Sequence, residues 1–210
     1  MSIVEPIHAD QRFFLQGVPW RTYLELRDSR ENQHIRMTYN QGQLEMTAPS
    51  KRHEHFGYFL GRLIDVWTEE LNIDVQSCRT MTFKREDLLR GLEPDNCYYI
   101  AHEAAIRNKE ELDFTVDPPP DLAIEIDLGG GAMDKLEIYA AFRVPEVWRY
   151  DGDDLFIYIL GSSDIYTVSP VSKCLPGFPS RKIEAIMQKI GSTSDTELVR
   201  AFRQTVRTKP

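Results

Sequence analysis

The sequence has 210 residues, of which 41% are hydrophobic and 28% are charged, and its net charge is −8 at pH 7. This composition is sufficient for a packed core, excludes a wholly disordered chain and is not typical of a protein that binds nucleic acid over its whole surface. No segment approaches the roughly 18 consecutive apolar residues of a membrane span, and the first ten residues lack the basic start and apolar run of a signal peptide, so we expect a cytoplasmic protein with no membrane partner.

The N-terminal part of the chain is predicted to contain an arm, a hairpin and two helices. Residues 1–18 are expected to form a loose arm, followed by a short helix over residues 20–27. Residues 34–48 alternate around a turn at Asn40-Gln41-Gly42, which predicts a β-hairpin. A long helix should then begin after the N-cap Ser50, because apolar residues recur at steps of three and four. These residues are Phe56, Phe59, Leu60, Leu63, Ile64, Trp67 and Leu71.

The next part of the chain is predicted to be mostly extended. Residues 73–85 are typical of one or two short strands, and the polar residues 85–95 should end in a proline turn. A short aromatic strand is expected to begin just after Asp95. Residues 102–120 are expected to form a partly helical excursion, which three consecutive prolines end and hold extended.

A strictly alternating strand is predicted over residues 121–128. Leu122, Ile124, Ile126 and Leu128 should point to one face of it, and Asp121, Ala123, Glu125 and Asp127 to the other. Three glycines at positions 129–131 then end the strand before a helix over residues 132–142. These glycines favour a flexible turn; they could also hold a phosphate at the helix N-terminus, but they lack the ending of a nucleotide P-loop.

The C-terminal part should add three strands within residues 146–169 and two helical pieces within residues 180–208. The order of elements predicts an α/β protein with a central mixed β-sheet flanked by helices and an N-terminal β-hairpin. We divide it into an arm (1–18), a main domain (19–170) and a helical extension packed on the same domain (171–210).

Charge and cysteine content add two expectations. From Arg181 onward, seven basic and three acidic residues give a net charge of +4, which leaves −12 for the rest of the chain. The basic end is compatible both with a local phosphate-contacting surface and with an ordinary solvated helix. Cys78, Cys97 and Cys174 are far apart in the sequence, so we expect reduced thiols rather than a disulfide framework or a zinc site.

The acidic residues around the predicted strand suggest a metal site. Glu125 and Asp127 are two residues apart and therefore share a face, about 6.6 Å apart along the strand. If the strand after Asp95 pairs beside them, Asp95 contributes a third carboxylate, while Lys135, expected one turn into the next helix, reaches back over the strand end. Carboxylate oxygens suit Mg²⁺ or Mn²⁺. Such an ion activates water for phosphodiester hydrolysis, and the lysine would orient that water.

The same spacing also has an ordinary structural interpretation. A half-exposed strand commonly carries charged residues on its solvated face, and a lysine is a common residue on a helix surface. Residue spacing alone leaves both interpretations open.

Three segments carry a resemblance to a known family. The sequences "GLEPDNCYYI", "PPPDLAIEIDL" and "DKLEIYAAFRVPEVWRYD" resemble the Uma-type endonucleases, which belong to the PD-(D/E)XK restriction-endonuclease-like superfamily. The segment "GQLEMTAPSKRHEH" is similar to the hairpin and helix start of that family. The resemblance covers residues 23–165 and implies a restriction-endonuclease-like fold.

The resemblance also implies roles for individual residues. Asp95 would be the metal-binding aspartate of the PD element, and Glu125 the acidic residue of the (D/E)XK element. Asp127 occupies the position of the usual lysine, and the matching lysine would be Lys135 on the next helix. Glu45 and His53 would lie near the mouth of the site, although Glu45 is also typical of an outward-facing hairpin residue. The turn after the strand departs from the family, where a Leu-Ser-Pro-Ser-like sequence is common.

Together these observations predict a metal-dependent endonuclease that hydrolyses phosphodiester bonds in DNA. Asp95, Glu125 and Asp127 are the predicted ligands of Mg²⁺ or Mn²⁺, and Lys135 is predicted to position water. A homodimer is expected, because cutting both strands of a duplex requires two sites. Two alternatives remain: a catalytically degenerate nuclease-fold protein that binds nucleic acid or a protein partner, and a metal-dependent hydrolase of a small phosphorylated molecule.

Overall fold

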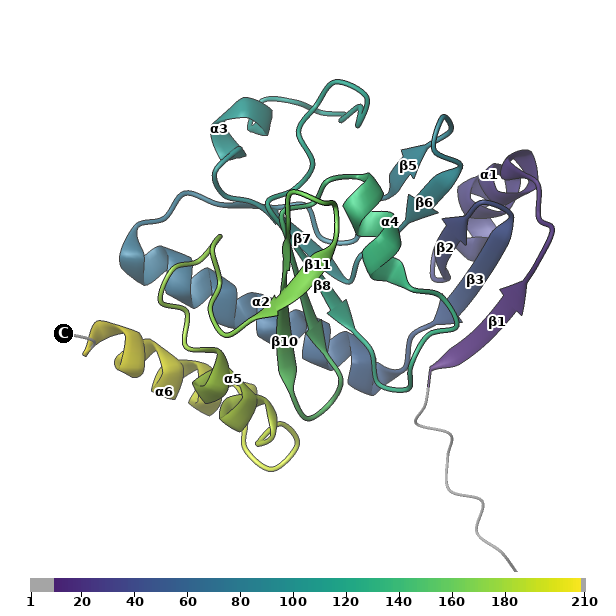
Figure 1. The fold of residues 1–210 in the computed structure, drawn as a ribbon. Coiled ribbons are helices and arrows are strands. Elements are labelled where there is room, and N and C mark those ends of the chain that lie inside the picture. Colours follow the sequence, from purple (N-terminus) through teal and green to yellow (C-terminus); the bar gives the residue numbers. More distant parts are fainter. Residues whose placement is uncertain (1–9, 209–210) are drawn as a thin grey trace, which may run out of the picture.

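The computed structural model describes residues 10–208, which form two β-sheets and their covering helices (Figure 1). The five-stranded sheet has the order β1 (Gln11–Leu15), β3 (Gln43–Ala48), β2 (Arg36–Asn40), β6 (Arg90–Leu92) and β5 (Phe83–Arg85). The six-stranded sheet has the order β11 (Tyr166–Ser169), β10 (Leu155–Leu160), β9 (Glu146–Tyr150), β8 (Leu122–Ile126), β7 (Asn96–Tyr99) and β4 (Gln76–Ser77). The helices are α1 (Trp20–Asp28), the 3-10 helix η1 (Arg30–Asn32), α2 (Lys51–Leu71), α3 (Glu103–Ile106), α4 (Lys135–Ala141), α5 (Ser180–Met187) and α6 (Asp195–Arg207).

The six-stranded sheet is mixed and is covered on both faces. Strands β8 and β9 run parallel with α4 as their crossover, while the other neighbours are antiparallel. Helices α2, α5 and α6 pack on one face, and α4 packs on the other (Figure 1). The predicted restriction-endonuclease-like α/β fold with a central mixed sheet is therefore confirmed. No helix among residues 10–208 combines the length and apolar character needed to cross a membrane.

The alternation predicted for residues 121–128 is confirmed in the shorter strand β8. Ile124 and Ile126 join the core beneath α2, whereas Ala123 joins the core beneath α4. Asp121 precedes the strand and takes no part in the acidic cluster. Its buried carboxylate accepts hydrogen bonds from the backbone N–H groups of Ile100 (2.7 Å) and His102 (3.0 Å). Asp121 therefore has a structural role at the opposite end of β8 from Asp127.

Helix α2 begins as predicted, because the Ser50 side chain accepts a hydrogen bond from the backbone N–H of His53 (3.2 Å). One glycine allows this helix to approach β7 closely. A Cβ atom added at Gly61 would lie 2.9 Å from the Tyr98 hydroxyl and 3.0 Å from Asn96 Nδ2. The close approach brings the first turn of α2 to the N-terminal end of β7.

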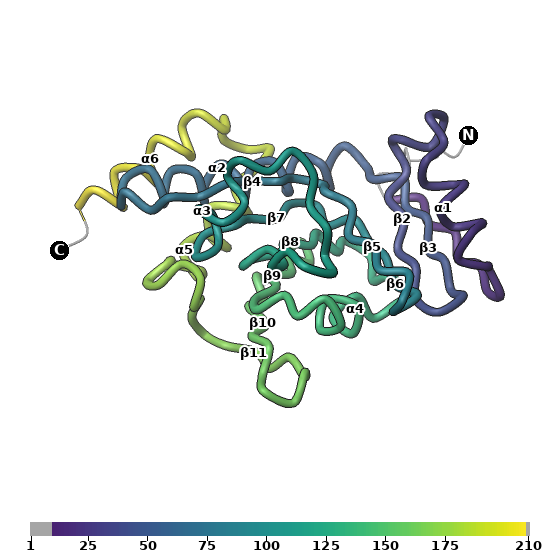
Figure 2. The backbone as a smooth tube through the Cα atoms, turned by 90° about the horizontal axis from the view of Figure 1, so that it is seen from above, coloured from purple at the N-terminus to yellow at the C-terminus, as the bar shows by residue number. Residues whose placement is uncertain are grey.

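The predicted loose arm is wrong for residues 11–15, which form β1 and pair with β3 in the register Gln11↔Ala48 to Leu15↔Leu44. Residues 1–9 of the arm lie outside the described part of the chain. The polar stretch 85–95 also contains an unpredicted strand, β6, which pairs with both β2 and β5. The predicted hairpin β2–β3 is thereby part of a larger sheet, which stands beside the six-stranded sheet and carries α1 on its outer side (Figure 2).

The basic C-terminal region forms the two predicted helical pieces, and α6 packs on α2. Two of its arginines form ion pairs with α2: Arg203 with Glu69 (3.0 Å) and Glu70 (2.5 Å), and Arg207 with Glu70 (2.8 Å). These pairs favour the interpretation of the basic end as a solvated helix. The three cysteines are free thiols, as predicted.

Candidate active site

A cavity of about 450 Å³ lies where the two sheets meet the start of α2 and α4. Asp95, Glu125 and Lys135 line it, together with His53 from α2. The pairing expected of the strand after Asp95 is present, because β7 is antiparallel to β8 and Asp95 N–H donates to the carbonyl of Ile124 (3.0 Å). The structure therefore brings these four residues, distant in sequence, around one cavity.

The Asp95 carboxylate is held by two hydrogen bonds and one ion pair at the base of this cavity. Its Oδ1 lies 2.8 Å from His53 Nε2 and 3.1 Å from Arg36 Nε, and its Oδ2 accepts a hydrogen bond from Ile126 N–H (2.6 Å). The side chain is 4% exposed. Burial opposes ionisation of Asp95, but the His53 hydrogen bond and the neighbouring cations outweigh it, so the pKa is lowered. Asp95 is thus fixed as an anion.

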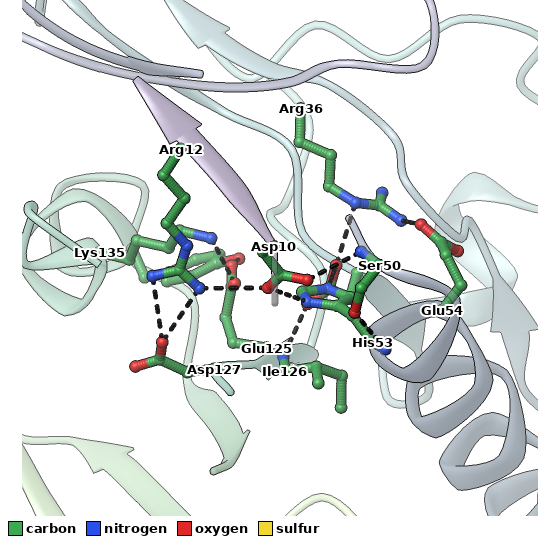
Figure 3. Close-up of polar contacts among 12 residues, drawn as sticks. Asp10, Arg12, Arg36, Ser50, His53, Glu54, Glu125, Ile126, Asp127 and Lys135 are labelled. Carbon is green, nitrogen blue, oxygen red and sulfur yellow. Dashed lines mark hydrogen bonds and ion pairs between the residues drawn. The ribbon is translucent and has the colours of Figure 1, made fainter. Parts of the chain in front are cut away.

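His53 lies between two carboxylates (Figure 3). Its Nε2 contacts Asp95, and its Nδ1 lies 2.8 Å from Asp10 Oδ2. Burial lowers the pKa of His53, but the contacts with Asp95 and Asp10 outweigh that effect and raise it. Burial raises the pKa of Asp10, but the N–H of Ser50 and the charge of His53 lower it overall. An imidazolium donating from both ring nitrogens is consistent with these directions.

Glu125 is buried and has two side-chain partners. Lys135 Nζ donates to its Oε2 (2.6 Å), and the Tyr139 hydroxyl donates to its Oε1. Burial raises the pKa of Glu125 and is only partly offset by Lys135. Burial lowers the pKa of Lys135, but the charges of Glu125 and Asp95 raise it overall.

Lys135 is the first residue of α4, so its predicted position one turn into the helix is wrong. The helix starts later than predicted because Asp134 is its N-cap and accepts a hydrogen bond from Leu136 N–H (3.0 Å). An aspartate just before the apolar-periodic residues is a recognisable start signal. The later start places Lys135 next to the end of β8, within reach of Glu125.

Asp127 and Glu45 also line the cavity, but both are bound by groups of the protein. Asp127 lies just past the end of β8, where its Oδ1 contacts Arg12 Nη1 (3.4 Å) and Nη2 (3.3 Å; Figure 3). Glu45 is 2% exposed and accepts a hydrogen bond from Ala132 N–H (2.6 Å). The reading of Glu45 as an outward-facing hairpin residue is therefore wrong, and Glu45 anchors the end of the glycine turn.

The sequence interpretation missed five residues of the site. They are Asp10, Arg12, Arg36, Tyr139 and Arg149. Tyr139 is four residues after Lys135 and therefore lies on the same face of α4, a spacing that could have identified it. Asp10 and Arg12 lie in the segment expected to be a loose arm, so no pattern connected them with the site.

The donor set fits a hard divalent cation. A carboxylate has about four lone-pair positions, and hydrogen bonds use two of them on Asp95 and two on Glu125. Both groups therefore have capacity for a further ligand. Residues 10–208 contain no group of three or more His, Cys, Asp or Glu side chains arranged to hold a metal. Mg²⁺ needs fewer, since it is commonly bound by one or two carboxylates together with water and substrate phosphate.

Comparisons with known proteins agree with this fold. A search of curated proteins found no match. A solved structure described as a putative nuclease of DUF820 from Anabaena variabilis is similar, with a TM-score of 0.52 and 14% identity over 88% of this chain and 99% of that chain. At this identity the similarity concerns the fold alone. The model of the Uma2 family, described as "Putative restriction endonuclease", matches residues 20–184. This chain is a member of the Uma2 family.

Proposed function

We propose that this protein is a metal-dependent endonuclease that hydrolyses phosphodiester bonds in DNA. The observation that carries the proposal is the convergence of Asp95, Glu125 and Lys135 on one cavity. Two buried carboxylates and an ammonium group supply the negative charge and the hydrogen-bond donor that this chemistry requires. Membership of the Uma2 family supports a nuclease rather than another metal-dependent hydrolase.

In this proposal each side chain has a separate task. Asp95 and Glu125 would hold Mg²⁺ or Mn²⁺, and Asp127 would assist from the rim. When bound, such an ion would lower the pKa of water and stabilise charge on the phosphodiester oxygens. Lys135 would orient the attacking water through its ammonium hydrogens. His53 keeps Asp95 in place, and Tyr139 does the same for Glu125.

We also propose that the protein acts as a cytoplasmic homodimer, since cleavage of both strands of a duplex requires two sites. A nucleic-acid-binding protein without catalytic activity is the second candidate. The contact between Arg12 and Asp127 favours this second candidate, because the arginine already pairs with one of the predicted metal ligands.

Plasmid nicking tests the proposal. Wild-type protein should nick supercoiled DNA with Mg²⁺ or Mn²⁺, and Glu125→Ala, Lys135→Ala and EDTA should each abolish nicking. Glu110→Ala is a matched control, because Glu110 is exposed and is not among the residues that line the cavity. Wild-type protein that is inactive with both metals would support the second candidate. Activity that survives both substitutions would contradict the assignment of this site.

A further inference from the structure

Arg149 lies beside Glu125 on the cavity side of the six-stranded sheet. Strands β8 and β9 are parallel and pair in the register Glu125↔Arg149. Residues paired in this way project from the same face of a sheet. Both side chains line the cavity, so Arg149 is a direct neighbour of a proposed metal ligand.

Arg149 differs from the other cations of this cavity in having no carboxylate partner among the described residues. Lys135 forms an ion pair with Glu125. Arg12 forms ion pairs with Asp10 and Asp127. Arg36 forms ion pairs with Glu54 and Asp95. The Nε of Arg149 is buried and has no hydrogen-bond acceptor within residues 10–208. A buried donor without an acceptor is costly and uncommon in proteins.

Two aromatic rings of β10 hold the Arg149 side chain. Its Cζ lies 5.5 Å from the ring centroid of Phe156 and 5.3 Å from that of Tyr158. Phe156 is also the cross-strand partner of Arg149. The N–H groups of a guanidinium lie in its plane, so stacking on ring faces leaves them available to an acceptor. Arg149 is therefore a positioned cation with donor capacity next to the proposed site of cleavage.

We propose that Arg149 binds the nonbridging oxygens of a phosphate group of the nucleic acid, next to the phosphodiester held at Asp95 and Glu125. This inference rests on the proposed function and adds a substrate-binding residue to it. A guanidinium matches two phosphate oxygens at once. The acidic residues of the cavity repel the phosphate backbone of the nucleic acid. Arg149 would offset this repulsion, because no carboxylate among the described residues of the cavity neutralises its charge.

The test is equilibrium binding of a fluorescent DNA duplex at several salt concentrations, with EDTA so that the probe is not consumed. Arg149→Gln should weaken binding on the order of tenfold, as expected for loss of a charged hydrogen bond. The slope of log K against log [salt] should also decrease by about one, since one phosphate contact is lost. Arg149→Lys should retain the slope but recover only part of the affinity, because an ammonium cannot bind two oxygens in parallel.

Arg200→Ala is the charge-matched control, because Arg200 is exposed on α6 and is not among the residues that line the cavity. It should bind like the wild type, and thermal unfolding should show that each variant is folded. Equal affinity and equal slope for folded Arg149→Gln and wild type would overturn the inference and leave Arg149 as a residue that only stacks. If wild-type protein binds no DNA in EDTA, calorimetric titration with inorganic phosphate decides. Phosphate binding that Arg149→Gln loses supports the phosphate site, and no phosphate binding overturns the inference. The plasmid-nicking assay tests the nuclease proposal separately.

Discussion

Asp95→Asn is expected to lower the rate of DNA cleavage by about three orders of magnitude or more. Asparagine has nearly the same shape, but it lacks the negative charge that would hold a divalent cation. The electrostatic stabilisation that such an ion provides amounts to several kcal/mol, and each 1.36 kcal/mol corresponds to about a tenfold change in rate. The measurement is single-turnover cleavage of a labelled duplex with Mg²⁺, together with calorimetric titration of Mn²⁺, which should no longer bind to the variant.

Glu54→Gln is the matched control for this prediction, because Arg36 contacts both Glu54 (2.6 Å) and Asp95 (3.1 Å). Each variant removes one carboxylate from Arg36, but only Asp95 faces the proposed metal. The Glu54 side chain is 56% exposed, and exposed ion pairs contribute roughly 1 kcal/mol or less, so cleavage should fall by less than about fivefold. Equal, large losses in both variants would show that displacement of Arg36, and not loss of a metal ligand, causes the defect.

Glu146→Ala is expected to lower the free energy of unfolding by about 3–5 kcal/mol, because three donors lose their acceptor and each unsatisfied buried donor costs roughly 1–3 kcal/mol. Glu146 is fully buried in β9. Its Oε1 accepts a hydrogen bond from Trp148 Nε1 (2.6 Å), and its Oε2 accepts from the N–H groups of Lys173 (2.8 Å) and Cys174 (3.0 Å). The carboxylate therefore connects the central sheet to the segment that leads to α5.

Urea denaturation followed by tryptophan fluorescence measures this effect. Glu146→Gln is the control, since it keeps the side-chain length and one oxygen acceptor, and it should lose clearly less stability than the alanine variant. If both variants unfold at the wild-type urea concentration, the three hydrogen bonds contribute little. The predicted role of Glu146 in holding the C-terminal segment would then be wrong.

Local patterns were sufficient for the long elements of the fold. The apolar spacing of α2 and the Ser50 cap depend on residues close in sequence, so helix periodicity predicted them. The same holds for the hairpin β2–β3 and the alternation in β8. Strand β1 was missed because it pairs with β3, across a long stretch of chain. Strand β6 was missed because it has only three residues and pairs with β2, which is also distant in the chain. Their stability comes from neighbours that periodicity does not reveal.

For the site, the sequence alone identified the chemical types of the central residues: two carboxylates that suit a hard cation, and a lysine nearby. Asp95 contributes to the site only because β7 pairs with β8. From the sequence, this pairing had to be assumed and could not be derived. The contributions of Asp10, Arg12, Arg36 and Arg149 were decided only by tertiary structure. The physical reason is that these residues come from three strands, β1 with the residue before it, β2 and β9. The order of strands in a sheet is set by packing and hydrogen bonding between segments far apart in the chain.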